Sequence, residues 1–240
     1  MISQQLAMLD NRIRFQLRRF MIPHRLKRGF FTAVLVCLSF IVVDGQGLME
    51  RGIAIPRETQ ASLVESLQPL EEAVLLIKQQ DDPFVVAYEP DVSIYLKAVQ
   101  TAVFHNEFHH EKQFEVADRL IQTGLARAAH LLNGRAPWAN QTGLVVRGYR
   151  SKLDDSVQPY GLVVPEKYQS TGTDAHRMDI WLHGRDNRLT ELKFIDQRER
   201  SKGQFAPQNA FVLHPYGRFC NAFKFGGEVD VLEAKEHVQR

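Results

Sequence analysis

A short apolar strand that stops at a glycine constrains the fold of this chain more than any other feature. Residues 178–182 predict a buried strand, which ends abruptly at His183-Gly184. A strand that stops at such a turn leaves backbone N–H groups directed at open space. Groups of this kind form oxyanion holes, which stabilise negative charge developing on a carbonyl oxygen. The sequence therefore predicts half of a catalytic site here, with a plain turn glycine as the alternative.

An attacking serine to complete that site is not evident. A nucleophile elbow places Gly-x-Ser-x-Gly on a sharp turn from strand to helix, and the 240 residues contain no such motif. Ser151, Ser156, Ser170 and Ser201 all lack the flanking glycines and the context of strand followed by helix. We expect no triad-dependent turnover from this chain alone.

The second half of the chain has the pattern of an α/β sheet. Residues 143–150 and 158–165 flank a polar turn and predict a β-hairpin. The later elements expected are strands at 178–183 and 210–214 and helices at 189–198 and 228–238. Two antiparallel strands followed by strand, helix, strand and helix predict an α/β fold for residues 139–240.

Residues 46–138 predict a helical region instead. Apolar residues recur at helical spacing within 63–77, 91–103 and 114–132. Pro69 predicts a kink or a restart in the first of these helices, and Asp91 is expected to cap the second. Pro137-Trp138 then joins this region to the strands.

The N-terminus has the layout of a secretory signal. Basic residues lead into fourteen residues without a charge, 30–43, which is short for a membrane span of roughly 20. We therefore predict a signal peptide over 1–45, with Met21 as an alternative start and an uncleaved membrane anchor as the alternative reading. The protein is expected to be exported, to the periplasm or the extracellular space.

Charge and cysteine content exclude other classes. The first 45 residues hold seven Lys or Arg and two Asp; subtracting them from the chain's 30 basic and 28 acidic residues leaves 23 and 26, a net charge of −3. A mildly acidic body does not predict a nucleic-acid partner. Cys37 lies in the signal core, so processing would leave Cys220 alone and an internal disulfide is excluded.

One histidine-rich segment carries side chains that can bind a metal ion. His105 and His109 are four residues apart and would share a helix face, with Glu107 and His110 nearby. The spacing is not that of a zincin, and a third ligand is not evident. We interpret the segment as a solvated helix end and expect no metal ion and no cofactor.

Three segments together resemble a known family. Tyr160-Gly161-Leu162-Val163-Val164-Pro165, Asp179–Arg185 and Val212–Arg218 have the order and spacing found in secreted bacterial α/β-hydrolases of the prolyl oligopeptidase-like and feruloyl-esterase-like type. Phe104–Phe108 and Ala136-Pro137-Trp138 are similar to the helical extension of such proteins. The resemblance covers roughly residues 60–240.

This resemblance implies the first half of an α/β-hydrolase sheet, strands 1–4 of the order 1-2-4-3-5, truncated before the nucleophile elbow. Gly184 and Arg185 match the loop that contributes a backbone N–H to the oxyanion hole. Tyr216, Arg218 and Asn221 follow strand 4 and are expected to line a substrate cleft at the carboxyl ends of the strands. His183 is expected to orient its loop, because the catalytic histidine of the family lies late in the chain.

The resemblance implies that the chain is the N-terminal part of an exported serine hydrolase acting on peptide or ester substrates. It would hold the oxyanion loop without the catalytic Ser, Asp and His. Two alternatives remain open, a non-enzymatic exported binding module and a signal-anchored membrane protein. Membrane contact is expected only through the N-terminal segment.

Overall fold

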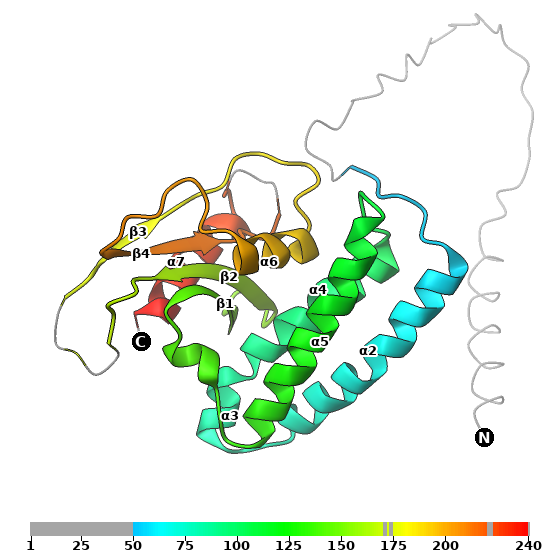
Figure 1. The fold of residues 1–240 in the computed structure, drawn as a ribbon, viewed down its shortest axis with the longest axis horizontal. Helices are drawn as coiled ribbons and strands as arrows, with labels where there is room; N and C mark the ends of the chain where they lie inside the picture. The colour runs from blue at the N-terminus through cyan, green and yellow to red at the C-terminus, as the bar shows by residue number, and fades with distance from the viewer. Residues whose placement is uncertain (1–49, 170–171, 173–174, 220–222, 240) are drawn as a thin grey trace, which may run out of the picture. The chain divides into compact units, whose positions relative to one another are not determined.

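The computed structural model describes residues 50–169, 172, 175–219 and 223–239. Gly45–Arg240 forms one compact unit (Figure 1). The predicted signal peptide lies outside the described residues, as do Asn221 and Cys220.

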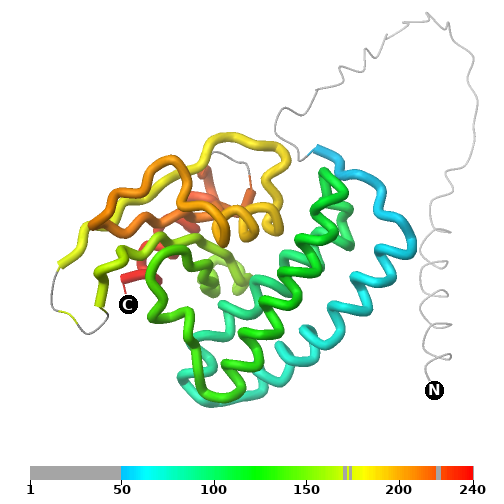
Figure 2. The backbone as a smooth tube through the Cα atoms, viewed as in Figure 1, coloured from blue at the N-terminus to red at the C-terminus, as the bar shows by residue number. Residues whose placement is uncertain are grey.

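The first half of this unit is helical, as predicted. Its elements are α2 (Arg57–Lys78), α3 (Pro83–Tyr88), α4 (Pro90–His105), α5 (Lys112–Leu132) and the short 3-10 helix η1 (Pro137–Asn140). Helices α2 and α5 run side by side and both pack against α4 (Figure 2). The apolar stripe of α2, which runs from Leu63 to Ile77, is buried as its periodicity predicts.

Two details of the helical half differ from expectation. Helix α2 continues through Pro69 without a restart, since packing of its apolar face outweighs one lost backbone hydrogen bond. Asp91 does not cap α4. It lies in the first helical turn, and its side chain accepts hydrogen bonds from residues far away in the chain.

The second half is a mixed sheet with the strand order β1-β2-β4-β3. The strands are β1 (Gly143–Arg150), β2 (Val157–Val164), β3 (Arg177–Ile180) and β4 (Ala210–Pro215). Strand β2 is antiparallel to both β1 and β4, whereas β3 is parallel to β4. The coarse α/β prediction is confirmed by this mixed sheet and its helices.

Different helices cover the two faces of the sheet. Alternate residues of a strand point to opposite faces, and Gly148 and Gly161 lie on the face against α4 and α6 (Glu191–Arg200). Tyr149 and Tyr160 point the other way and contact α7 (Gly226–Val238), where Tyr149 donates a hydrogen bond to the Asp230 carbonyl. The faces therefore carry helices from different parts of the chain.

A glycine allows the closest approach between the helical half and the sheet. A Cβ atom at Gly148 would lie 2.3 Å from the Pro90 carbonyl oxygen. The first turn of α4 can therefore lie directly on β1. One hydrophobic core includes residues of α2, α4, α5, α6 and the sheet. The helical half and the sheet half, which differ in sequence pattern, therefore share one core.

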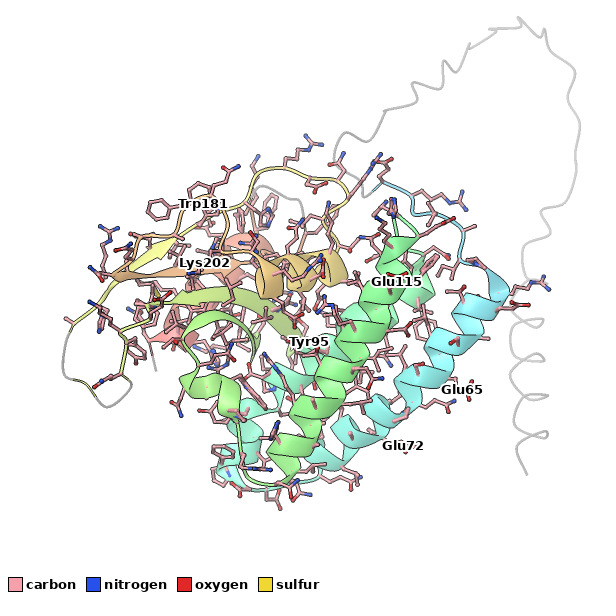
Figure 3. The ribbon with its side chains drawn as sticks, in the orientation of Figure 1. Glu65, Glu72, Tyr95, Glu115, Trp181 and Lys202 are labelled. Carbon is pink, nitrogen blue, oxygen red and sulfur yellow. The ribbon has the colours of Figure 1, made fainter. Side chains whose placement is uncertain are left out.

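Strand β3 forms an open edge of this sheet. Ile180, Trp181 and Leu182 are 37%, 36% and 49% exposed. Trp181 donates its backbone N–H to the Leu213 carbonyl, 2.8 Å away, and its ring stacks on that of Phe205. Figure 3 labels Trp181 beside β3, on the side of the sheet away from α2. The prediction of a buried strand at 178–182 is therefore wrong, because among the described residues β3 pairs with β4 alone and lies at the edge of the sheet.

Candidate functional site at the carboxyl edge of the sheet

His183 joins the loops that follow β3 and β4. Its Nε2 atom lies 2.9 Å from the Tyr216 carbonyl oxygen. Its Nδ1 atom lies 3.0 Å from the Gly184 carbonyl oxygen, so both ring nitrogens face hydrogen-bond acceptors. The ring also packs against Phe223 at 4.8 Å between centroids. His183 therefore fixes its loop to the neighbouring one, which is the positioning role expected of it.

Gly184 and Arg185 lie on the exposed part of this loop, directly beyond the carboxyl end of β3. Among the described residues, neither backbone N–H has a hydrogen-bond acceptor. Gly184 does not have a left-handed φ angle, and the space that a Cβ would fill is empty to 4 Å. Both residues are exposed, while the oxyanion role itself stays a prediction.

Packing in the core holds the side chain of Tyr216 in position. Its side chain is buried, and the hydroxyl donates a hydrogen bond to the Leu189 carbonyl at 3.3 Å. The ring packs against Phe194 of α6. Tyr216 therefore links the end of β4 to the start of α6.

Arg218 is the centre of a charged network. Its guanidinium donates to Asp230 at 2.8 Å, to Asp154 at 2.5 Å and to the Ser151 hydroxyl at 2.7 Å. These contacts hold the pKa of Asp154 well below its usual range, mainly through the hydrogen bond from Arg218. The charge of Arg218 is therefore already balanced by this protein's own carboxylates.

Tyr216 and Arg218 nevertheless line a common pocket of about 350 Å³ beside the carboxyl end of β4, and Gly184 and Arg185 are not part of its lining. Ligands of α/β sheets bind in this position. The residues that complete the lining are Lys97, Thr101, Glu107, Asp154, Ser156, Gln158, Glu191 and Phe219. The substrate-binding role of Tyr216 and Arg218 stays a prediction, and Asn221 lies outside the described residues.

The helical half contributes functional groups that sequence reasoning missed. Lys97 and Thr101 lie one turn apart on α4, and Glu107 lies in the loop after this helix. Lys97 is a charged residue within the otherwise buried stretch 90–99 of α4. A single lysine within an apolar stretch of the sequence could have indicated that this part of α4 faces a polar site.

Glu191 gives this pocket its unusual electrostatics. Its carboxylate lies 3.0 Å from the Lys97 ammonium, and burial raises its pKa despite that partner. Burial also raises the pKa of Glu107. The pocket thus contains two carboxyl groups whose charged forms are poorly solvated.

The serine hydroxyls near this pocket bind carboxylates. Ser151 donates to Glu233 at 2.6 Å, and Ser156 donates to Asp154 at 2.6 Å. A serine nucleophile needs a general base, which is usually a histidine. Neither contact provides that arrangement.

The histidine-rich segment is not one helix face. Helix α4 ends at His105, so His109 lies in the following loop, and the expected sharing of a face is wrong. Asn106, in the left-handed conformation, ends the helix there. Within the part of the chain that the structure describes, no group of three His, Cys, Asp or Glu side chains is arranged to hold a metal ion.

A larger groove of about 870 Å³ lies on the α7 face of the sheet. Tyr160, Leu162, Val164, Met178 and Phe211 form its apolar floor. It lies on the face opposite α4 and α6. The oxyanion-type loop is not part of its lining.

No helix among the described residues is long and apolar enough to cross a membrane. Comparisons with family models, with curated proteins and with solved structures found no match for this chain.

Proposed function

We propose that this chain is the N-terminal part of an exported serine hydrolase with an α/β-hydrolase fold, acting on peptide or ester bonds. The observation that carries this proposal is the sheet itself. The order β1-β2-β4-β3, with β2 antiparallel to its neighbours and β3 parallel to β4, is that of the first four strands of such a sheet. The order of strands in a sheet is set by the whole fold, so it supports the proposal separately from the short sequence motifs.

The loop beyond β3 gives the proposal its chemistry. In an acyl transfer, the N–H groups of Gly184 and Arg185 would donate hydrogen bonds to the oxygen of the tetrahedral intermediate. The exposure of both residues and the fixed position of His183 support this role. Such donors act because they are oriented before charge develops, and losing one typically costs about 10²–10³ in rate.

The nucleophile would come from a further strand on the open edge of β3. In the expected order that strand follows strand 3 and ends at the nucleophile elbow. The exposed apolar side chains of Ile180 and Leu182 are suited to packing beside such a strand. The chain by itself would then bind a carbonyl oxygen without attacking its carbon.

Activity-based labelling tests this proposal. The purified chain is treated with a fluorophosphonate probe and, separately, with p-nitrophenyl acetate. We expect no stoichiometric serine adduct and no hydrolysis above that of a heat-denatured sample. Stoichiometric labelling of one serine would overturn the claim that this chain lacks a nucleophile.

The reading frame beyond codon 240 provides a second test. A Gly-x-Ser-x-Gly motif within a few dozen codons, followed by an Asp and then a His, would support the hydrolase. Its absence from a continuing frame would remove the proposal. Cell fractionation tests export: a shortened product outside the cytoplasm supports a signal peptide, and full-length protein in membranes supports an anchor.

A binding module is the second candidate. The observation that favours it is the common core of the helices and the sheet, which forms one compact unit over Gly45–Arg240. A unit of that kind can be stable without a further domain. Monodisperse behaviour of residues 46–240 at high concentration would favour the module, and aggregation would favour a sheet that needs its missing strand.

A further inference from the structure

The carboxyl group of Glu191 is buried without a full set of hydrogen-bond partners. Glu191 is 6% exposed and lies in the first turn of α6, where it lines the pocket beside the carboxyl end of β4. Its Oε1 atom has no hydrogen-bond partner among the described residues. An unpartnered buried carboxyl oxygen is costly, so this position requires an explanation.

Lys97 satisfies only the other oxygen. Its ammonium lies 3.0 Å from Glu191 Oε2 and donates a second hydrogen bond to the Val157 carbonyl at 2.7 Å. The ion pair is therefore held between α4, β2 and α6. Oε1 is left to accept a hydrogen bond from a group that this part of the chain does not supply.

Two further acceptors line the same pocket. The carboxyl group of Glu107 is half-buried and has no hydrogen bond or ion pair among the described residues. The Thr101 hydroxyl is the third. A primary ammonium group has three N–H donors, so it can bond to more than one of these acceptors at once.

We propose that this pocket binds the ammonium group of a primary amine, with Glu191 Oε1 and Glu107 as its principal acceptors. The proposal does not depend on the hydrolase assignment.

The charges around the pocket favour a cation over an anion. Arg218 is neutralised by Asp154 and Asp230, and Lys97 pairs with Glu191, which leaves the Glu107 carboxyl group in the lining without an ion-pair partner among the described residues. A bound ammonium would balance this carboxylate, and Phe219 offers apolar surface for an alkyl stem. A volume of about 350 Å³ suits a ligand of a few carbon atoms.

Titration of the full chain with n-pentylammonium chloride at pH 7 tests the proposal, followed by ¹⁵N NMR. We expect saturable shifts at Thr101, Glu107 and Glu191, with a dissociation constant on the order of millimolar for so small a ligand. n-Pentanol, a neutral ligand of the same shape, should bind at least tenfold more weakly. Equal binding of the two ligands would overturn the proposal.

Matched variants locate the acceptor. Glu191→Gln should weaken pentylammonium binding by about 10- to 100-fold, since the acceptor loses its negative charge. Glu72→Gln, at an exposed position of α2 labelled in Figure 3, should leave it unchanged. Unchanged affinity in a folded Glu191→Gln protein would refute the role of Glu191.

Glu107→Gln keeps the proposal testable if Glu191→Gln does not fold. This variant should weaken binding several-fold, and no change would contradict the proposal. Failure of amine binding leaves the labelling result untouched, so the two proposals fail independently.

Discussion

The two edge strands of the sheet, β1 and β3, differ in how their outer edges are covered. At β1, the Asp91 carboxylate accepts a hydrogen bond from the outward-facing N–H of Gly148 at 2.6 Å. It also accepts from Trp138 Nε1 and from Arg147, both at 2.8 Å. At β3, the apolar side chain of Ile180 is exposed, and in the part of the chain that the structure describes no helix packs extensively on this strand. One edge is closed by the chain's own residues, while the other is suited to receiving a further strand.

This difference shows which edge strand the chain covers with its own residues. Unpaired strand edges are sites of association, which proteins usually block with charge or coverage. Here, the start of α4 blocks the β1 edge, and its carboxylate is completely buried. Four predictions test the contrast, from the largest expected effect to the smallest.

Replacing Asp91 should open the closed edge. Asp91→Ala leaves Arg147, Trp138 and the Gly148 N–H without their acceptor inside the protein. Breaking a buried ion pair from one side typically costs about 3–5 kcal/mol. Urea denaturation should show this loss in the free energy of unfolding.

The exposed pair Lys152–Glu236 serves as the control for Asp91. Its partners are 68% and 50% exposed, and Glu236→Ala should cost less than about 1 kcal/mol. Comparable losses in the two variants would mean that the Asp91 network does not close the edge.

A buried histidine on the interior strand β4 should make the free energy of unfolding depend on pH. His214 is buried on the α6 face, and burial, with smaller effects of Arg198 and His183, lowers its pKa to about 4. The unfolded chain takes up this proton near pH 6.5, so stability is full above pH 6.5 and is lost as the pH falls toward 4. The shift corresponds to about 3 kcal/mol.

A His214→Gln variant isolates this effect. Unfolding free energies measured at pH 7 and pH 4.5 should differ less in the variant than in the unmodified protein. Other carboxyl groups titrate in both proteins, so only the difference between the two slopes reports on His214. Identical slopes would contradict the assignment.

The close approach of α4 to β1 gives the third prediction. Gly148→Ala would place a methyl group against the Pro90 carbonyl, and overpacking of this kind costs about 1–3 kcal/mol. Gly134→Ala tests a different cause, because Gly134 has open space around it and a φ of 66°. Crowding predicts that Gly148→Ala also shifts the NMR signals of α4, whereas Gly134→Ala leaves them unchanged.

Local patterns were sufficient to predict most of the elements. Alternation and turn residues predicted β1, β2 and β4 to within a residue or two, because these signals act between near neighbours. Strand β3 is shorter than expected, since pairing with β4 ends soon after Ile180. Helix α3 was missed because six residues carry little periodicity.

The candidate site was less predictable because its residues meet only after folding. Tyr216 and Arg218 follow the end of β4, as the sequence indicates, while their role in binding a substrate stays a prediction. Their contacts with Leu189, Asp154 and Asp230 depend on tertiary packing that spacing does not encode. The pairing of Glu191 with Lys97 was not visible for the same reason, since it joins helices from the two halves of the chain.

The smallest effect on stability is expected at the open edge, where the effect on association should be clear. Ile180→Lys places a charge on an exposed position of β3 and should change the free energy of unfolding by less than about 1 kcal/mol. Sedimentation of the unmodified chain should show association that increases with concentration, and Ile180→Lys should reduce it, because charge on an edge disfavours strand pairing. Leu75→Lys is the matched control, since Leu75 is an exposed apolar residue of α2 away from any strand. Equal reduction by both variants would mean that general surface hydrophobicity, and not the β3 edge, drives association.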